Sequence, residues 1–193
     1  MKRALLSIVF VAACGDNLAA PGPLAYTDPG AGKLRLVKDP ATAGNEIVLD
    51  LVVGDAPLTG YSAGFDLPVA PNTIVLAGFT PGTALPAGGP PVAAMGALPT
   101  QGPLANELVT AQSQKASGDG AVTADAALAA GAVLYTLRVD PAPGGKPAIV
   151  FDGTAAGFTL PSGGLRDRKG NTVVDAKDVA IGKLELTYTV GSM

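Results

Sequence analysis

Short apolar runs that repeat every two residues constrain the fold of this chain more than any other feature of its sequence. In the run 184–190, one side carries Leu184, Leu186, Tyr188 and Val190, and the other carries Glu185, Thr187 and Thr189. The run 47–53 alternates in the same way, and turn-forming residues, among them 26 glycines and 17 prolines, interrupt such runs along the chain. This pattern predicts short β-strands with one buried face.

Ten strands are expected from this pattern, and no repeating strand-helix unit is visible between them. They cover residues 34–37, 46–53, 61–67, 73–79, 107–114, 132–140, 148–152, 157–160, 172–174 and 181–189. The alanine-rich run 123–130 is expected to form either one short helix or a loop, because Thr123 can cap a helix and Gly131 ends it. The sequence therefore predicts one all-β domain over residues 33–193, built as an antiparallel sandwich of two sheets.

The first fourteen residues have the pattern of an export signal. Lys2 and Arg3 precede the apolar run 4–13, which leads to Cys14, the only cysteine. This run of ten residues, nine of them apolar, is too short to span a bilayer as a mature helix, which needs about 20. Two interpretations follow, a lipid attached to Cys14 or an ordinary secretory leader followed by a free thiol.

The end of this leader resembles the lipobox of bacterial lipoproteins, in the residues Val11-Ala12-Ala13-Cys14. The resemblance implies cleavage of a signal peptide, residues 1–13, diacylglycerol on the Cys14 thiol and an acyl chain such as palmitate on the new amino terminus. Several acyl chains give stable anchoring, whereas one does not. Residues 14–32 are expected to form the lipidated cysteine and a flexible tether. Since Gly15 and not an aspartate follows Cys14, the outer membrane is favoured over the inner one within a bacterial cell envelope.

Composition excludes several classes of function. The chain has no histidine and no tryptophan, so it lacks a histidine base for nucleophilic catalysis and the best stacking platform for a sugar. Ser62 lies in a Gly-x-Ser-x-Gly pattern, but it falls in an expected strand and has no histidine partner. A formal charge of −3 does not suit binding to a phosphate backbone. The sequence predicts no enzyme, no cofactor and no nucleic-acid partner.

The strand order is similar to that of cohesin-like domains. Residues 60–76 resemble their early strands, 131–139 with 148–151 their paired central strands, and 167–173 with 182–186 their closing hairpin and last strand. The corner departs from that family, since Val69-Ala70-Pro71 stands where the family has Tyr-Asp-Pro. The resemblance implies a jelly-roll sandwich of about nine strands that acts as a non-catalytic protein-interaction or surface-assembly module. The alternative is a carbohydrate-binding module on the same fold.

Candidate ligand-binding residues are few. Four oxygen-bearing side chains within residues 167–178 could bind calcium, or they could belong to a solvated turn in which basic residues alternate with the acids. These four are Asp167, Asn171, Asp175 and Asp178. Among the four tyrosines, Tyr26 falls in the expected tether, while Tyr135 and Tyr188 alternate with aliphatic residues and are expected in the core. Tyr61 is the one tyrosine expected to be exposed for a ligand.

The segment 80–106 has no clear periodicity. It holds six prolines and scattered apolar residues, and a loop of this length in a compact domain is usually functional or disordered. It is expected either to be an apolar binding loop at one end of the sandwich or to fold over the sheet, with a short strand near 92–95.

Overall fold

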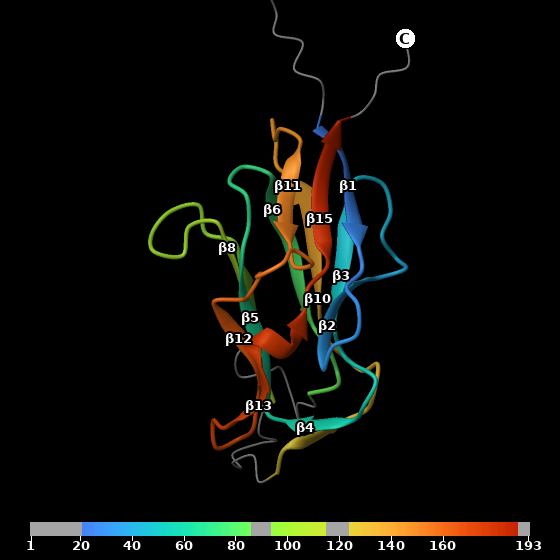
Figure 1. Cartoon of the computed structure of the whole chain (residues 1–193), viewed down its shortest axis with the longest axis vertical. Helices are drawn as coiled ribbons and strands as arrows, with labels where there is room; N and C mark the ends of the chain where they lie inside the picture. Colours follow the sequence, from blue (N-terminus) through green and yellow to red (C-terminus); the bar gives the residue numbers. More distant parts are fainter. Residues whose placement is uncertain (1–20, 86–93, 115–123, 189–193) are drawn as a thin grey trace, which may run out of the picture.

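The computed structural model describes residues 21–85, 94–114 and 124–188. These residues form fifteen strands and one short 3₁₀ turn, η1 (Ala176–Asp178). All strand pairs are antiparallel except one, and the sheets pack against one another around a shared core (Figure 1). The expected all-β antiparallel sandwich is therefore confirmed. Within the described ranges, no helix has the length and apolar character needed to cross a membrane.

The first sheet holds the longest strands. It has five strands in the order β14-β2-β3-β10-β6, in which β14 and β2 are the parallel pair. Their bounds are β2 (Leu34–Lys38), β3 (Ile47–Val53), β6 (Ile74–Pro81), β10 (Val133–Pro141) and β14 (Val179–Ala180). Every residue of the central strand β3 is buried, on the outer face as well as on the core face.

Three further sheets complete the fold. A five-stranded sheet has the order β13-β12-β5-β8-β7, a three-stranded sheet has the order β1-β15-β11, and β4 pairs with β9 in a short ribbon. The bounds are β5 (Ser62–Pro68), β7 (Ala94–Ala97), β8 (Glu107–Ser113), β12 (Ser162–Arg166) and β13 (Thr172–Asp175) for the five-stranded sheet. The others are β1 (Pro21–Thr27), β11 (Ala148–Asp152), β15 (Lys183–Tyr188), β4 (Leu58–Gly60) and β9 (Ala126–Leu128).

The core lies between the first sheet and the others. Tyr135 of β10 is fully buried, and its ring centre lies 6.2 Å from that of Phe65 in β5 and 5.1 Å from that of Phe79 in β6. This confirms the expected core position of Tyr135. The side chain of Tyr188 lies outside what the structure describes.

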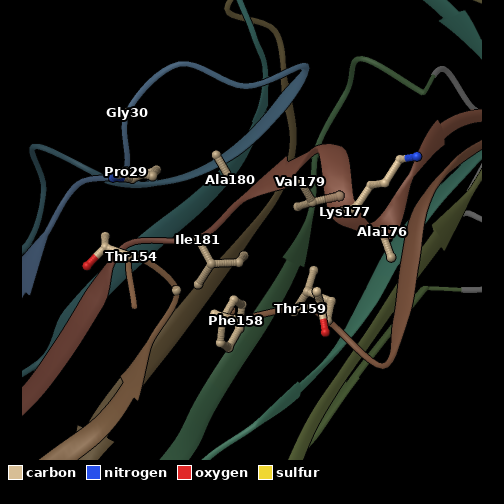
Figure 2. Close-up of a pocket in the computed structure, with 12 residues that line it drawn as sticks. Pro29, Gly30, Thr154, Phe158, Thr159, Ala176, Lys177, Val179, Ala180 and Ile181 are labelled. Atoms are coloured by element: carbon tan, nitrogen blue, oxygen red, sulfur yellow. The ribbon is translucent and has the colours of Figure 1, made fainter. Parts of the chain in front are cut away.

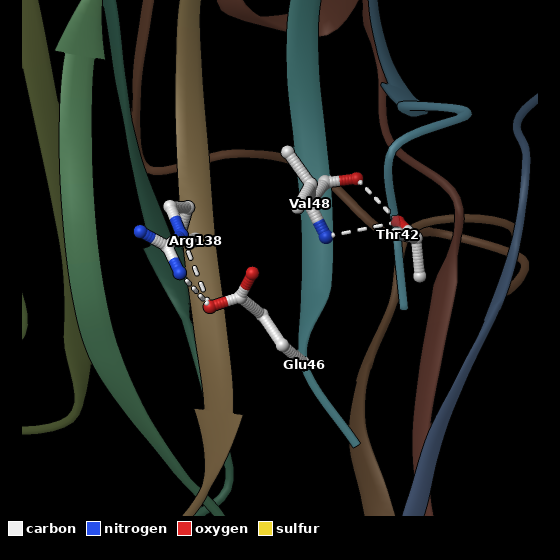
Figure 3. A network of polar contacts seen from close by, with 4 residues as sticks. All are labelled: Thr42, Glu46, Val48 and Arg138. Atoms are coloured by element: carbon white, nitrogen blue, oxygen red, sulfur yellow. Dashed lines mark hydrogen bonds and ion pairs between the residues drawn. The ribbon is translucent and has the colours of Figure 1, made fainter. Parts of the chain in front are cut away.

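The loop between β2 and β3 is held against the first sheet. The Thr42 hydroxyl accepts a hydrogen bond from the Val48 amide at 3.0 Å and donates one to the Val48 carbonyl at 3.3 Å. At the end of the loop, Glu46 accepts two hydrogen bonds from Arg138 of β10, at 3.0 and 2.6 Å (Figure 3). The loop is therefore fixed by polar contacts to two neighbouring strands.

The expected tether over 14–32 is wrong for its second half. Pro21–Thr27 form β1, which pairs along β15, so the sandwich begins at residue 21 and not at 33. Leu24 is buried between exposed neighbours, and β1 is an edge strand, where proline costs no ladder hydrogen bond. Tyr26, also placed in the tether, donates from its hydroxyl to the Leu36 carbonyl at 2.6 Å and accepts from the Gly182 amide at 2.9 Å.

Two other local predictions are wrong. The run 123–130 was expected to form a short helix or a loop, but Ala126–Leu128 form strand β9, because pairing with β4 buries Leu128. Thr123, the expected helix cap, lies outside the described residues. The expected strand 157–160 is an irregular crossover from β11 to β12, although Leu160 is buried. The strand instead occupies Ser162–Arg166, where two adjacent glycines interrupt the alternation of apolar and polar residues that would have indicated a strand.

In the described part of the segment 80–106, the chain packs against the sheet, as the second alternative expects. The strand expected near 92–95 is found as β7, which pairs with β8 at the edge of the five-stranded sheet. Leu85 is buried, and a hydrogen bond of 2.8 Å from the Asn106 amide to the Pro99 carbonyl closes the turn before β8. Residues 86–93 of this segment lie outside the described residues.

Candidate interaction face

The outer face of the five-stranded sheet has almost no side chains along its middle. Strand register places one residue of each strand in a row across this face, and residues opposite one another in neighbouring strands share a face. The row consists of Asp175, Gly164, Gly64, Ala111 and Met95. Its centre is backbone and one methyl group, and we name this shallow depression, of about 230 Å³, the trough.

The glycines of the trough cannot carry side chains. A Cβ on Gly64 would lie 2.2 Å from the Thr110 carbonyl oxygen, and a Cβ on Gly164 would lie 1.9 Å from the Val174 carbonyl oxygen. Gly164 also has φ +111°, a backbone conformation that strains any other residue. Close packing of the strands therefore requires a bare floor at this position.

Met95 and Asp175 stand at the two sides of the trough. The Met95 side chain is 49% exposed, one of four large apolar residues that are exposed in the described part of the chain. Five neighbouring strands about 4.8 Å apart place these two walls roughly 19 Å from each other, with a floor about 10 Å wide. An α-helix is about 10 Å across, so the trough has room for one helix or one extended segment of another protein.

Charged side chains flank the trough along the strand direction. At one end Asp66 accepts a hydrogen bond of 2.6 Å from the Ser162 hydroxyl. At the other end Arg166 donates to the Thr172 hydroxyl at 2.8 Å. Asp66 and Ser62, which pairs with Arg166, are four residues apart on β5, or about 13 Å. The two ends of the trough therefore carry one negative and one positive group, and Asp175 adds a second negative group at one side.

Buried hydrogen bonds fix the β8 strand of the trough to the opposite sheet. The Thr110 hydroxyl lies 2.6 Å from the Tyr135 hydroxyl, and burial raises the pKa of that tyrosine. The side-chain amide of Gln112 pairs with the backbone of Gly82, donating at 2.9 Å and accepting at 3.1 Å. These bonds hold the trough in one shape before any partner binds, which lowers the entropic cost of association.

A second hollow lies where the two layers meet near β14. Its volume is about 280 Å³, and Figure 2 shows Phe158, Ile181 and Lys177 among its lining residues. Lys177 is the single charged side chain among the lining residues that the structure describes. A small apolar group fits such a hollow, but a pair of groups for acid-base chemistry does not occur there.

The four candidate calcium ligands have partners within the protein. Asp167 accepts from the backbone amides of Lys169 and Asn171 at 2.8 Å and from the Asn171 side chain at 2.7 Å, which lowers the pKa of the Asp167 carboxyl. Asp175 caps η1, and Asp178 forms an ion pair of 3.1 Å with Lys33. The described ranges contain no group of three or more acidic, histidine or cysteine side chains placed to hold a metal.

The remaining predicted site residues are dispersed. Tyr61 is half-buried between β4 and β5, and its backbone amide donates to the Arg166 carbonyl at 2.7 Å, beside the positive end of the trough. Ser62 is the first residue of β5, with no helix after it. Cys14 lies outside the described residues.

A buried carboxyl group that the sequence prediction missed lies on the other sheet. Asp50 is 7% exposed in β3 and accepts a hydrogen bond of 2.5 Å from the Thr136 hydroxyl. Burial raises the pKa of Asp50, the bond from Thr136 lowers it, and the neighbouring Asp39 carboxyl raises it further. The alternation of 47–53 places Asp50 on the outer face, but only strand pairing sets it between Val37 of β2 and Thr136 of β10.

The trough residues were also missed as a site. The signal that could have indicated them is glycine inside strand patterns, at Gly64 and at Gly163-Gly164, which often marks a close backbone approach.

Comparison of the chain with protein-family models, with curated proteins and with solved structures gives no match.

Proposed function

We propose that this chain is an exported lipoprotein, anchored in a bacterial envelope membrane through Cys14, whose sandwich is a non-catalytic protein-interaction module. The observation that carries the proposal is the trough, a rigid face with a backbone floor, an apolar wall and one charged group at each end. Flat, pre-organised faces of this kind suit binding to another protein.

The anchor part of the proposal depends on the leader. The positive start, the apolar run 4–13 and the lipobox-like residues before Cys14 agree with one another. The resemblance to cohesin-like domains, which occur as adhesion and assembly modules, supports an interaction role on the exported side. The absence of histidine from the sequence makes the enzyme alternative weaker.

The shape of the trough suggests what a partner presents. A floor about 10 Å wide admits one helix or one extended segment. Asp66 and Arg166, at opposite ends, favour a partner segment with a basic group near Asp66 and an acidic group near Arg166. Such complementary charges fix the direction in which the segment lies, whereas Met95 contributes apolar contact.

Crosslinking from the trough tests the interaction role. A photo-crosslinking residue replaces Ala111 in the floor, and in a control chain it replaces Ala77, an exposed residue of β6 on the other sheet. We expect a discrete adduct with one envelope protein from position 111, weakened by Met95→Ser in the apolar wall, and none from position 77. Equal adducts from both positions, or none from 111, reject the trough as the binding face.

Two further assays separate the alternatives. Metabolic labelling with a palmitate analogue should mark the parent chain and not the Cys14→Ser variant; an unlabelled parent rejects the anchor. A glycan array tests the carbohydrate alternative, because binding that Tyr61→Ala abolishes would favour a sugar ligand over a protein.

A further inference from the structure

The start of β1 and the end of β15 lie at the same end of the sandwich. Pro21 pairs with Tyr188, and Figure 1 shows both strand ends at the top together with the hairpin that joins β10 to β11. The Val69 amide donates to the Asn106 carbonyl and the Ala70 amide to the Val150 carbonyl, so the loops before β6 and β8 meet β11 there. We name loops 69–73, 98–106 and 142–147 the termini end.

The termini end is almost free of charge. Its three loops contain one charged residue, Lys146, whereas loops 28–33, 54–57 and 167–171 at the opposite end contain six. The loop 39–46 also reaches the termini end and carries Asp39 and Glu46, so the uncharged surface covers only part of that end. Charged groups are costly to bring against a bilayer, and these three loops avoid most of that cost. The nearest acidic groups on the adjoining strands are Asp140, which pairs with Val75, and Glu185, which pairs with Ile149.

Large apolar side chains are exposed beside the same loops. Val75 is 40% exposed, Leu104 42% and Ile149 51%, and they account for three of the four exposed large apolar residues in the described part of the chain. Val75 and Ile149 stand at the second positions of β6 and β11, directly after loops of the termini end, and Leu104 lies within one. A hollow of about 230 Å³, lined by residues that include Val75 and Leu98, opens in this surface.

The distance from Cys14 to the sandwich is short. Seven residue steps separate Cys14 from Pro21, the first residue of β1, and a chain of seven residues spans at most about 25 Å. A lipid on Cys14 therefore keeps the termini end close to the bilayer surface, whatever conformation the connecting chain adopts.

We infer that the termini end docks on the bilayer that holds the lipid of Cys14, an inference that rests on the proposed lipid anchor. Val75, Leu104 and Ile149 insert at the level of the lipid headgroups, and Lys146 faces their phosphates. The strands then run away from the membrane, so the trough faces sideways and its partner approaches along the membrane surface.

Fluorescence quenching on the full lipidated protein in vesicles tests this orientation. A lipid on Cys14 blocks the only native thiol, so one added cysteine carries one fluorophore. The two label sites are Gln101→Cys at the termini end and Lys169→Cys at the opposite end, both exposed. The vesicles contain phosphatidylethanolamine and phosphatidylglycerol with a quencher on the headgroup. Because β10 alone extends over about 30 Å, the two sites differ widely in distance from the membrane.

We expect strong quenching at position 101 and little at position 169. The changes Val75→Ser, Leu104→Ser and Ile149→Ser together should lose much of the quenching at 101 while the protein stays on the vesicles. Met95→Ser, at the fourth exposed apolar residue, should leave the quenching unchanged.

The failures of the two proposals differ in this experiment. Protein that stays on the vesicles with equal quenching at both sites, or with quenching that the triple serine variant does not reduce, overturns the docking and leaves the anchor intact. Protein that remains in solution with a reactive Cys14 thiol overturns the anchor, and the docking with it.

Discussion

The hydroxyl pair between the two layers gives the sharpest test of how the sandwich is held together. The Tyr135 hydroxyl has one partner, Thr110, at 2.6 Å. The Thr110 hydroxyl oxygen also lies 3.2 Å from both the amide nitrogen and the carbonyl oxygen of Phe65. Both side chains are almost fully buried, so water cannot replace a lost bond. Removing the two hydroxyls should therefore have unequal effects.

Tyr135→Phe removes one hydrogen bond and leaves Thr110 bonded to Phe65, so it should lower the free energy of unfolding by about 1 kcal/mol. Thr110→Val removes the same bond, leaves the Tyr135 hydroxyl buried without a partner and loses both contacts to Phe65. We expect a loss of about 3 kcal/mol, because an unpaired buried hydroxyl costs about 1 to 3 kcal/mol. In the Tyr135→Phe background, Thr110→Val should cost about 1 kcal/mol less than in the parent.

Urea unfolding of the mature chain, followed by far-ultraviolet circular dichroism, measures these differences, and thermal unfolding gives a second readout. For a domain of this size, 1 kcal/mol corresponds to about 2 to 4 °C in Tm. If Thr110→Val is no more destabilising than Tyr135→Phe, or if the two changes are additive, the assignment of a partnered hydroxyl pair in the core is incorrect.

Three further predictions concern single residues. Burial raises the pKa of Asp50, so the native state binds more protons than the unfolded chain and stability falls as pH rises above about 3.9. Asp50→Asn should remove that fall. Urea midpoints measured from pH 3 to 7 would contradict this prediction if they declined equally in the parent and the variant. Tyr26→Phe should cost about 1 to 2 kcal/mol and increase amide exchange in β1, because the hydroxyl joins β1 to Leu36 and Gly182; unchanged exchange would show that these two hydrogen bonds do not hold β1 in place. Gly164→Ala should cost more than about 2 kcal/mol, because its Cβ would meet the Val174 carbonyl; a variant as stable as the parent would show that the strands can separate there.

Local patterns predicted most of the strands but not those whose burial depends on distant partners. Strands β2, β3, β5, β6, β8, β10, β11, β13 and β15 all lie where alternation or an apolar run indicated them. Strand β1 was missed, because its prolines and glycine are typical of a tether and only pairing with β15, over 150 residues later, makes it a strand.

The same reason explains the two misplaced segments. Alanine favours a helix in isolation, but Ala126–Leu128 gain more from pairing with β4 and from burying Leu128. Leu160 is buried in a crossover without strand pairing, so an apolar run there indicated burial correctly and strand formation incorrectly.

The sequence by itself determined the class of the fold and the position of the proposed anchor. Alternating runs with frequent glycine and proline leave an antiparallel β-sandwich as the way to bury one face of each strand. Cys14, which follows a short apolar run, marks the predicted lipid attachment without any tertiary information.

Only the tertiary structure decided which surfaces can act. The trough exists because register brings Gly164, Gly64 and Ala111 into one row from three strands far apart in the chain. The termini end, with its single charged residue, likewise exists because three separate loops meet beside the start of β1. Both surfaces depend on which strands pair and in which register, and pairing between distant segments is decided by the packing of the whole core, so no local pattern could reveal either surface.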